Sequence, residues 1–346
     1  MKKLFRTLII FIILGLGVYF GYNYLFNNDT KKEEKEKPKL KIFDEDSDSR
    51  VIGVAINNNH DAWPHSGLND SFLNYEIIAE GGITRILSFF KDKDTQRIGS
   101  VRSARHYFID YMLENDAIFV HYGHSDQALS DIRDWNIDDI DGMFNDSTFF
   151  RDETLNKDYE HTAFTSMDLI KETIENKDIR DTSKEILLKY SIESNKLSER
   201  EDAFKADEVL IEYSTYTNTK YIYDEAEKTY KRFMSDTAHI DSVTNEQYTA
   251  KNIITYKVAN YAFDTYGRQN LDNVGKGEGY YISEGYAVPI KWSKKDRSSK
   301  TIYTFEDGQE IKVNDGNTWI QIQPKNKLLD IIEYEIEEEN TEGTVN

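Results

Sequence analysis

Short apolar runs dominate the pattern of hydrophobic and polar positions, and they predict many strands and few helices. The β-branched run Val51–Ile56 is typical of a buried strand. Asn74–Phe90 predicts two strands joined at Gly81-Gly82, because paired glycines between apolar runs favour a hairpin. Ala117–Gly123 predicts a further strand. The first half of the chain therefore contains several short strands.

Helical spacing appears between these strands. Ser103–Asp116 predicts a helix that begins at Ser103, with Tyr107 and Tyr111 four residues apart on one face. Ser125 and Ser166 each precede a further helical pattern and are expected to cap it. Alternating strands and helices indicate an α/β-like N-terminal domain over residues 50–190.

The pattern changes after the polar junction Ser191–Lys205. Short β-branched and aromatic runs then alternate with turns, and they predict a mostly antiparallel β domain over residues 206–325. The glycine-rich string Gly275–Gly279 is interpreted as a turn or bulge, because it precedes a strand rather than a helix. Residues 326–346 form an acidic tail. The fold class predicted for the whole chain is α+β.

The first residues differ from the rest. Residues 1–27 begin with basic side chains and continue with an apolar run of about twenty residues, long enough to cross a bilayer core of about 30 Å. No small-x-small cleavage site follows, which favours an uncleaved membrane helix over a cleaved signal peptide. Residues 28–49 are charged and predict a flexible stalk. We expect a single-pass protein of the cell membrane with an extracytoplasmic globular part.

Composition excludes several classes of function. The chain carries 43 Lys and Arg against 63 Asp and Glu, a formal net charge of −20, and nucleic-acid binding needs the opposite balance. No cysteine is present, which rules out disulfides, thiolate nucleophiles and cysteine-ligated metals. No nucleic-acid partner is therefore expected.

Cationic side chains nevertheless gather in one part of this acidic chain. Arg102 and Arg105 lie near the start of the predicted helix, and Arg85 lies on a predicted neighbouring strand. With His121 they are hypothesised to form an anion-binding patch. The alternative is structural, in which these arginines pair with Glu76, Glu80 or Asp110 and hold the sheet to the helix.

The histidines raise the question of a metal. His121 and His124 flank Gly123 at the end of a predicted strand, a common location for ligand sites. A zinc site with Asp126 or Asp61 is one interpretation. However, no ligand pair stands at helical spacing, so neither a metal nor a cofactor is predicted.

The segment Asn57–Asp70 is polar and too long for a simple turn. Asn58, His60 and Trp63 are candidate ligand residues, because amides bond sugar hydroxyls and an indole offers a flat apolar face. A surface loop rich in turn-forming residues is the alternative.

Longer strings carry a family resemblance over residues 50–325. They include YEIIAEGGITRILSFF, IGSVRSARHYFIDYMLENDAIFVHYG and HTAFTS in the first half, and GKGEGYYISEGYAVPIKW and DGNTWIQI in the second. These strings resemble the YerB-like family of bacterial lipoproteins. The resemblance implies two domains, export, membrane attachment and an unknown function. Such lipoproteins carry a cysteine for the lipid, which this chain lacks, so attachment is expected through the N-terminal helix.

Two classes of function remain at this point. The first is an envelope protein that binds an anionic or glycan ligand, a protein partner, or both. The second is an enzyme acting on envelope polymers, of phosphotransferase or hydrolase type, with the arginines and histidine as its cleft. The absence of nucleophile-elbow and phosphate-loop motifs favours binding.

Overall fold

The computed structural model describes residues 2–26 and 38–335, and the chain divides into two compact units, Met1–Pro38 and Lys39–Asn346. In the first unit, α1 spans Lys2–Phe26 as one continuous helix. Over the described residues, no helix combines the length and the apolar character needed to cross a membrane. The predicted single-pass anchor at residues 1–27 is therefore not supported. Most of the predicted stalk, residues 27–37, lies outside the described residues.

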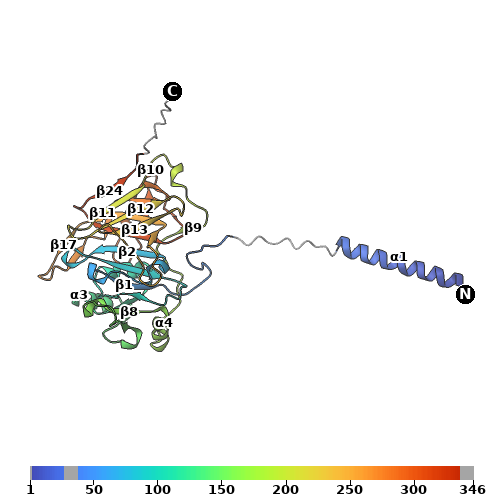
Figure 1. The fold of residues 1–346 in the computed structure, drawn as a ribbon, viewed down its shortest axis with the longest axis horizontal. Coiled ribbons are helices and arrows are strands. Elements are labelled where there is room, and N and C mark those ends of the chain that lie inside the picture. Colours follow the sequence, from blue (N-terminus) through green and yellow to red (C-terminus); the bar gives the residue numbers. More distant parts are fainter. Residues whose placement is uncertain (1, 27–37, 336–346) are drawn as a thin grey trace, which may run out of the picture. The chain divides into compact units, whose positions relative to one another are not determined.

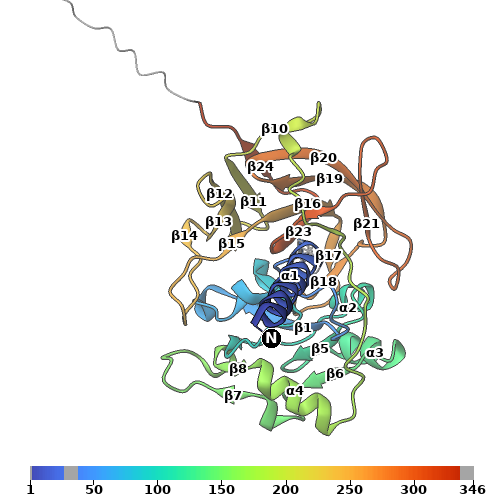
Figure 2. The same cartoon turned by 90° about the vertical axis from the view of Figure 1, so that its right-hand side faces the viewer.

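The second unit is built on one mixed sheet (Figures 1 and 2). Its order over the described residues is β10 (Phe204–Lys205), β20 (Tyr286–Lys294), β19 (Gly275–Ser283), β16 (Asn252–Val258), β23 (Thr318–Pro324), β2 (Leu73–Ile78), β3 (Thr84–Phe90), β1 (Ile52–Asn58), β5 (Ile118–His121) and β6 (Asp139–Asp141), with β21 (Ile302–Phe305) on β20. β23 lies parallel to both β2 and β16. One sheet therefore contains strands from both predicted domains. The boundaries of these domains stay a prediction.

A second sheet and several short pairings complete the strands. The second sheet contains β14 (Thr237–Ala238), β13 (Thr229–Met234), β12 (Asn218–Asp224), β11 (Glu208–Glu212) and β24 (Leu329–Ile332), with β15 (Thr249–Ala250) on β13. The short pairings are β17 (Asn260–Ala262) with β18 (Gln269–Leu271), β22 (Val313–Asn314) with β9 (Tyr190–Ser191), and β4 (Ile98–Gly99) and β7 (Phe150–Arg151) on either side of β8 (Ala163–Thr165). This arrangement confirms the α+β class.

Three short helices, α2 (Phe108–Glu114), α3 (Asp126–Asp134) and α4 (Met167–Asn176), lie at the end of the unit that contains β5 and β6 (Figure 2). Ser125 and Ser166 cap α3 and α4 as predicted, since each hydroxyl accepts a backbone N–H in the first turn. The predicted start of the earlier helix at Ser103 is wrong. α2 begins five residues later, because the Ser103 hydroxyl donates to the Tyr122 carbonyl instead of capping a helix.

Three other expectations need correction. The segment before residue 50 is not wholly unpacked, because Phe43 is buried against Phe72 and Tyr190. The string Gly275–Gly279 is part of β19 and not a turn. The acidic tail begins with a strand, because β24 pairs with β11; residues 336–346 lie outside the described part. In each case a long-range contact determined the local structure. The hairpin of β2 and β3 around η3 (Glu80–Gly82) was predicted correctly.

Candidate functional site

Arg85 and Arg105 share one carboxylate, that of Glu80. Arg85 is 4% exposed; it donates to the Ser103 carbonyl at 2.6 Å and to Glu80 Oε2 at 3.3 Å. Arg105 donates from Nε to Glu80 Oε1. Burial works to raise the pKa of Glu80, but the two guanidinium groups outweigh it and lower that pKa to about 2. The pairing with Glu80 that the structural alternative expected is therefore present.

The other two members of the predicted patch have different partners. Arg102 lies 3.0 Å from Glu160 Oε1, and about a quarter of its side chain is exposed. His121 is fully buried, with Nδ1 at 2.8 Å from the Gly123 carbonyl oxygen and Nε2 at 3.1 Å from Asp139 Oδ2. Of the four residues of the predicted patch, only Arg85 and Arg105 thus contact a common group, the Glu80 carboxylate. An anion-binding role for these four residues stays a prediction.

The candidate loop residues are placed in two environments. Asn58 is buried and its amide donates to Thr84 Oγ1 at 2.6 Å, while it accepts from Trp63 Nε1 at 3.1 Å. His60 lies outside the core, stacked on Tyr216 with 4.2 Å between ring centroids. Asn58 therefore supports the fold, whereas His60 and Trp63 form part of an aromatic surface.

A buried polar chain that the sequence did not reveal connects the two sheets. Arg232 donates from one nitrogen to Glu76 Oε2 at 2.7 Å and from another to His239 Nδ1. His239 Nε2 contacts His65 Nδ1, and His65 Nε2 contacts the Asn57 carbonyl oxygen. All five residues are at most 3% exposed. Their positions are far apart in the sequence, so no local signal groups them.

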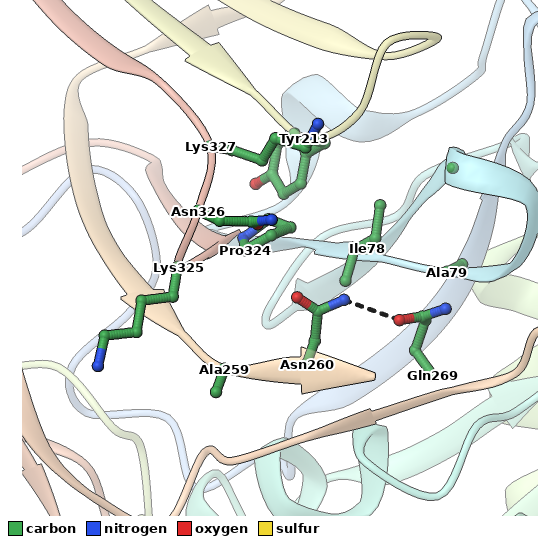
Figure 3. A pocket seen from close by; sticks show the side chains of 11 residues that line it. Ile78, Ala79, Tyr213, Ala259, Asn260, Gln269, Pro324, Lys325, Asn326 and Lys327 are labelled. Atoms are coloured by element: carbon green, nitrogen blue, oxygen red, sulfur yellow. Dashed lines mark hydrogen bonds between the residues drawn. The ribbon is translucent and has the colours of Figure 1, made fainter. Parts of the chain in front are cut away.

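Two adjoining cavities open beside β16, β19 and the β17–β18 hairpin. The smaller has a volume of 390 Å³ and is shown in Figure 3, and the larger has a volume of 1210 Å³. Both are lined by Ala259 and Lys325. Inside the smaller one, the Asn260 amide donates to Gln269 Oε1 at 2.7 Å (Figure 3). The two cavities therefore adjoin, and together they are called the lysine groove.

The glycines of β19 shape the larger cavity. A Cβ at Gly277 would lie 2.6 Å from Trp292 Nε1, and one at Gly279 would lie 2.3 Å from the Thr255 carbonyl oxygen. Both distances are too short for a side chain, so glycine is needed where β16 and Trp292 pack against the strand. The sequence signal was the string GKGEG, which was interpreted as a turn or bulge.

Lysines border this region. Lys325 and Lys327 line the smaller cavity, and Lys276 joins Lys325 along the larger one. Among the residues that the structure describes, the ammonium groups of these three lysines have no hydrogen-bond or ion-pair partner. The lysine groove therefore combines open volume with three ammonium groups that make no direct ion pair with the described residues, although Asp272, Glu278 and Glu306 also line the larger cavity.

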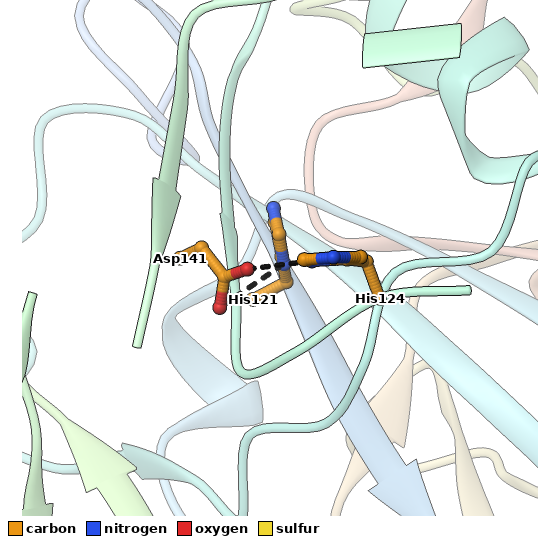
Figure 4. Close-up of side chains that lie close together, drawn as sticks. All are labelled: His121, His124 and Asp141. Atoms are coloured by element: carbon orange, nitrogen blue, oxygen red, sulfur yellow. Dashed lines mark hydrogen bonds and ion pairs between the residues drawn. The ribbon is translucent and has the colours of Figure 1, made fainter. Parts of the chain in front are cut away.

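Two histidines and a carboxylate meet at the carboxyl ends of β5 and β6 (Figure 4). His124 Nδ1 lies 2.7 Å from Asp141 Oδ2, and His121 Nδ1 lies 3.9 Å from Asp141 Oδ1. The acidic partner is thus Asp141, and neither Asp61 nor Asp126 belongs to the cluster. Parallel pairing of β5 with β6 places His121 opposite Asp141, which sequence alone could not show.

Asp141 is held in place by the backbone. Its Oδ1 accepts from Gly123 N at 2.8 Å and from Met143 N at 2.9 Å. Burial acts to raise the pKa of Asp141, but His121, these two N–H groups and His124 together hold it below its usual value. The carboxylate is therefore ionised, with Oδ2 directed at His124.

The sheets and helices define an α+β protein in which two sequence segments share one central sheet. Family models match both segments: "Protein of unknown function (DUF3048) N-terminal domain" matches residues 40–180, and the corresponding C-terminal domain matches residues 209–320. The chain belongs to this DUF3048 family, and the resemblance inferred from sequence is confirmed.

The relatives agree with this assignment. The chain is 29% identical over 285 residues to the "Putative lipoprotein YerB" of Bacillus subtilis (strain 168), which covers 80% of this chain and 82% of that protein. The crystal structure of YerB from Bacillus subtilis has a TM-score of 0.72 at 26% identity, covering 83% of this chain and 97% of that one. The family itself is described as one of unknown function.

Proposed function

We propose that this chain is an extracytoplasmic envelope protein that binds an anionic glycan in the lysine groove. The observation that carries the proposal is the set of unpartnered ammonium groups of Lys276, Lys325 and Lys327 beside two adjoining cavities. In a chain of net charge −20, ammonium groups without a direct ion pair among the described residues favour an anionic ligand at that place, above all in the smaller cavity, whose described lining includes Lys325 and Lys327 and no carboxylate.

The remaining lining suits a sugar polymer. The amides of Asn260, Gln269 and Asn326 can donate to and accept from hydroxyl groups. Tyr280 supplies a partly exposed ring along the larger cavity. Amides for hydroxyls, a ring for an apolar sugar face and ammonium groups for acidic substituents are the complementary groups of a charged glycan. The proposed ligand class is the one expected from sequence, at a location other than the arginine patch.

The envelope location rests on two observations. The relative in Bacillus subtilis is named a lipoprotein, a class attached to the outer side of a membrane. The chain begins with Lys2, Lys3 and Arg6 ahead of an apolar run, the arrangement of an export signal. Both support an extracytoplasmic position for the globular unit.

Binding to heparin, a sulfated glycan, tests the proposal against binding to dextran, a neutral glycan. Titration calorimetry on the full-length protein should detect heparin, with an affinity that falls as salt rises. Replacing Lys276, Lys325 and Lys327 together by Gln should weaken heparin binding about tenfold or more, because each charge-assisted hydrogen bond contributes about 1.5–3 kcal/mol.

Two control variants locate the site. Gln at the exposed Lys177 and Lys184, which lie outside the lysine groove, should leave heparin binding unchanged. Arg102→Ala examines the arginine patch. Equal binding by the wild type and the lysine-groove variant, or a loss confined to Arg102→Ala, would overturn the lysine groove as the site.

A further inference from the structure

The cluster of His121, His124 and Asp141 has donor atoms at metal-binding separations. One nitrogen from each imidazole and one carboxylate oxygen all lie within 4.8 Å of one another. In a tetrahedral zinc site, bonds of about 2.0–2.2 Å place neighbouring donor atoms about 3.3–3.6 Å apart. His124 Nδ1 lies 2.7 Å from Asp141 Oδ2, and His121 Nδ1 lies 3.9 Å from Asp141 Oδ1. The first distance is shorter and the second longer than the separation in a tetrahedral site. Small side-chain rotations therefore suffice for all three to reach one ion.

The surroundings of these donors match those of a metal centre. With Nδ1 of His121 facing the cluster, its other nitrogen, Nε2, lies 3.1 Å from Asp139 Oδ2. Such carboxylate–histidine pairs orient metal-binding imidazoles and raise their basicity. Asp141 is fixed through Oδ1 by two backbone N–H groups, which leaves Oδ2 on the side of His124.

Nδ1 of His121 also lies 2.8 Å from the Gly123 carbonyl oxygen, a contact that needs a proton on that nitrogen. Binding of an ion there would replace this proton, as metal binding to imidazole does in general. The contact is thus a property of the metal-free cluster and is compatible with loading.

We propose that His121, His124 and Asp141 bind one divalent transition-metal ion of the zinc class. Two imidazoles and one carboxylate suit Zn²⁺ and its neighbours better than Mg²⁺ or Ca²⁺, which take oxygen ligands. Three protein ligands leave the fourth position open to water or to a ligand atom. The His124 side chain is 14% exposed and faces the exposed ring of Phe144, so the ion has a route from solvent.

Zinc titration of the full-length protein, after stripping with a chelator, tests the proposal. One Zn²⁺ per chain should bind, and Co²⁺ in its place should give the intense visible absorption of a four-coordinate site. His124→Gln should weaken Zn²⁺ binding about a hundredfold, and Asp139→Asn about tenfold, the range typical of supporting carboxylates. His60→Gln, which removes a histidine outside the cluster, should leave the affinity unchanged.

His124→Gln is preferred to a change at His121 or Asp141, because it removes the most exposed member of the three. Thermal unfolding of the metal-free variants establishes that they fold. No Zn²⁺ bound by the wild type, or equal Zn²⁺ affinity in the wild type and His124→Gln, would overturn the site. An affinity lost only in His60→Gln would place the ion at the surface loop and would overturn it as well.

Discussion

Arg232 donates a hydrogen bond to Glu76 at 2.7 Å, and neither side chain is exposed to solvent. Arg232 lies on β13 of the second sheet and Glu76 on β2 of the central sheet. The guanidinium also lies over the ring of Trp319, at 4.4 Å from its centroid. This buried ion pair therefore joins the second sheet to the central sheet.

Replacing Arg232 by Ala is expected to lower the free energy of unfolding by about 3–5 kcal/mol, because the Glu76 carboxylate then stays buried without its cation. Lys231→Ala on the same strand is the control. Lys231 pairs with Asp224 at the surface, where solvent screens the charges, so its loss should change the free energy of unfolding little. Urea unfolding of both variants measures the two losses of free energy. Equal losses would show that the buried pair stabilises the fold no more than the surface pair does.

The arginines of the predicted patch should differ in stability. Arg85→Ala removes a buried partner of Glu80 and of the Ser103 carbonyl, and we expect a loss of about 3 kcal/mol. Arg102→Ala removes a partly exposed pair with Glu160 and should cost less than about 1 kcal/mol. Thermal unfolding of the two variants measures this; a large loss for Arg102→Ala would make it a structural residue too.

His65 and His239, the two histidines of the buried polar chain, predict a loss of stability at low pH. Burial lowers the pKa of His65 to about 3 and that of His239 well below its usual 6.5. Arg232 donates to His239 Nδ1, which leaves Nε2–H of His239 to donate to His65 and Nε2–H of His65 to donate to Asn57, so both rings are neutral.

Since the unfolded chain takes up these protons below about pH 6.5 and the folded chain does not, the histidines' contribution is full above that pH and falls as the pH drops towards 3. Each histidine should cost about 2 kcal/mol between about pH 7 and about pH 5. Urea unfolding at the two pH values measures the loss, and His65→Gln should reduce it by about half. If the His65→Gln variant lost as much free energy of unfolding between the two pH values as the wild type, groups other than His65 would cause the loss.

Local chemistry was sufficient for part of this structure. Ser125 and Ser166 cap their helices because a hydroxyl next to an apolar helical pattern needs only its own first turn. The hairpin of β2 and β3 follows from two glycines between apolar runs. The chain's resemblance to its family also came from sequence, because long strings of residues carried it.

Long-range pairing decided the rest. β23 lies between β2 and β16, and β5 places His121 opposite Asp141, through contacts between segments that no local pattern connects. The partners of the cations were set in the same way: Glu80 for Arg85 and Arg105, and Glu76 for Arg232. Sequence by itself determined which side chains could ionise or bind. Only the tertiary structure decided which of them meet, because burial and charge pairing depend on distances in space rather than along the chain.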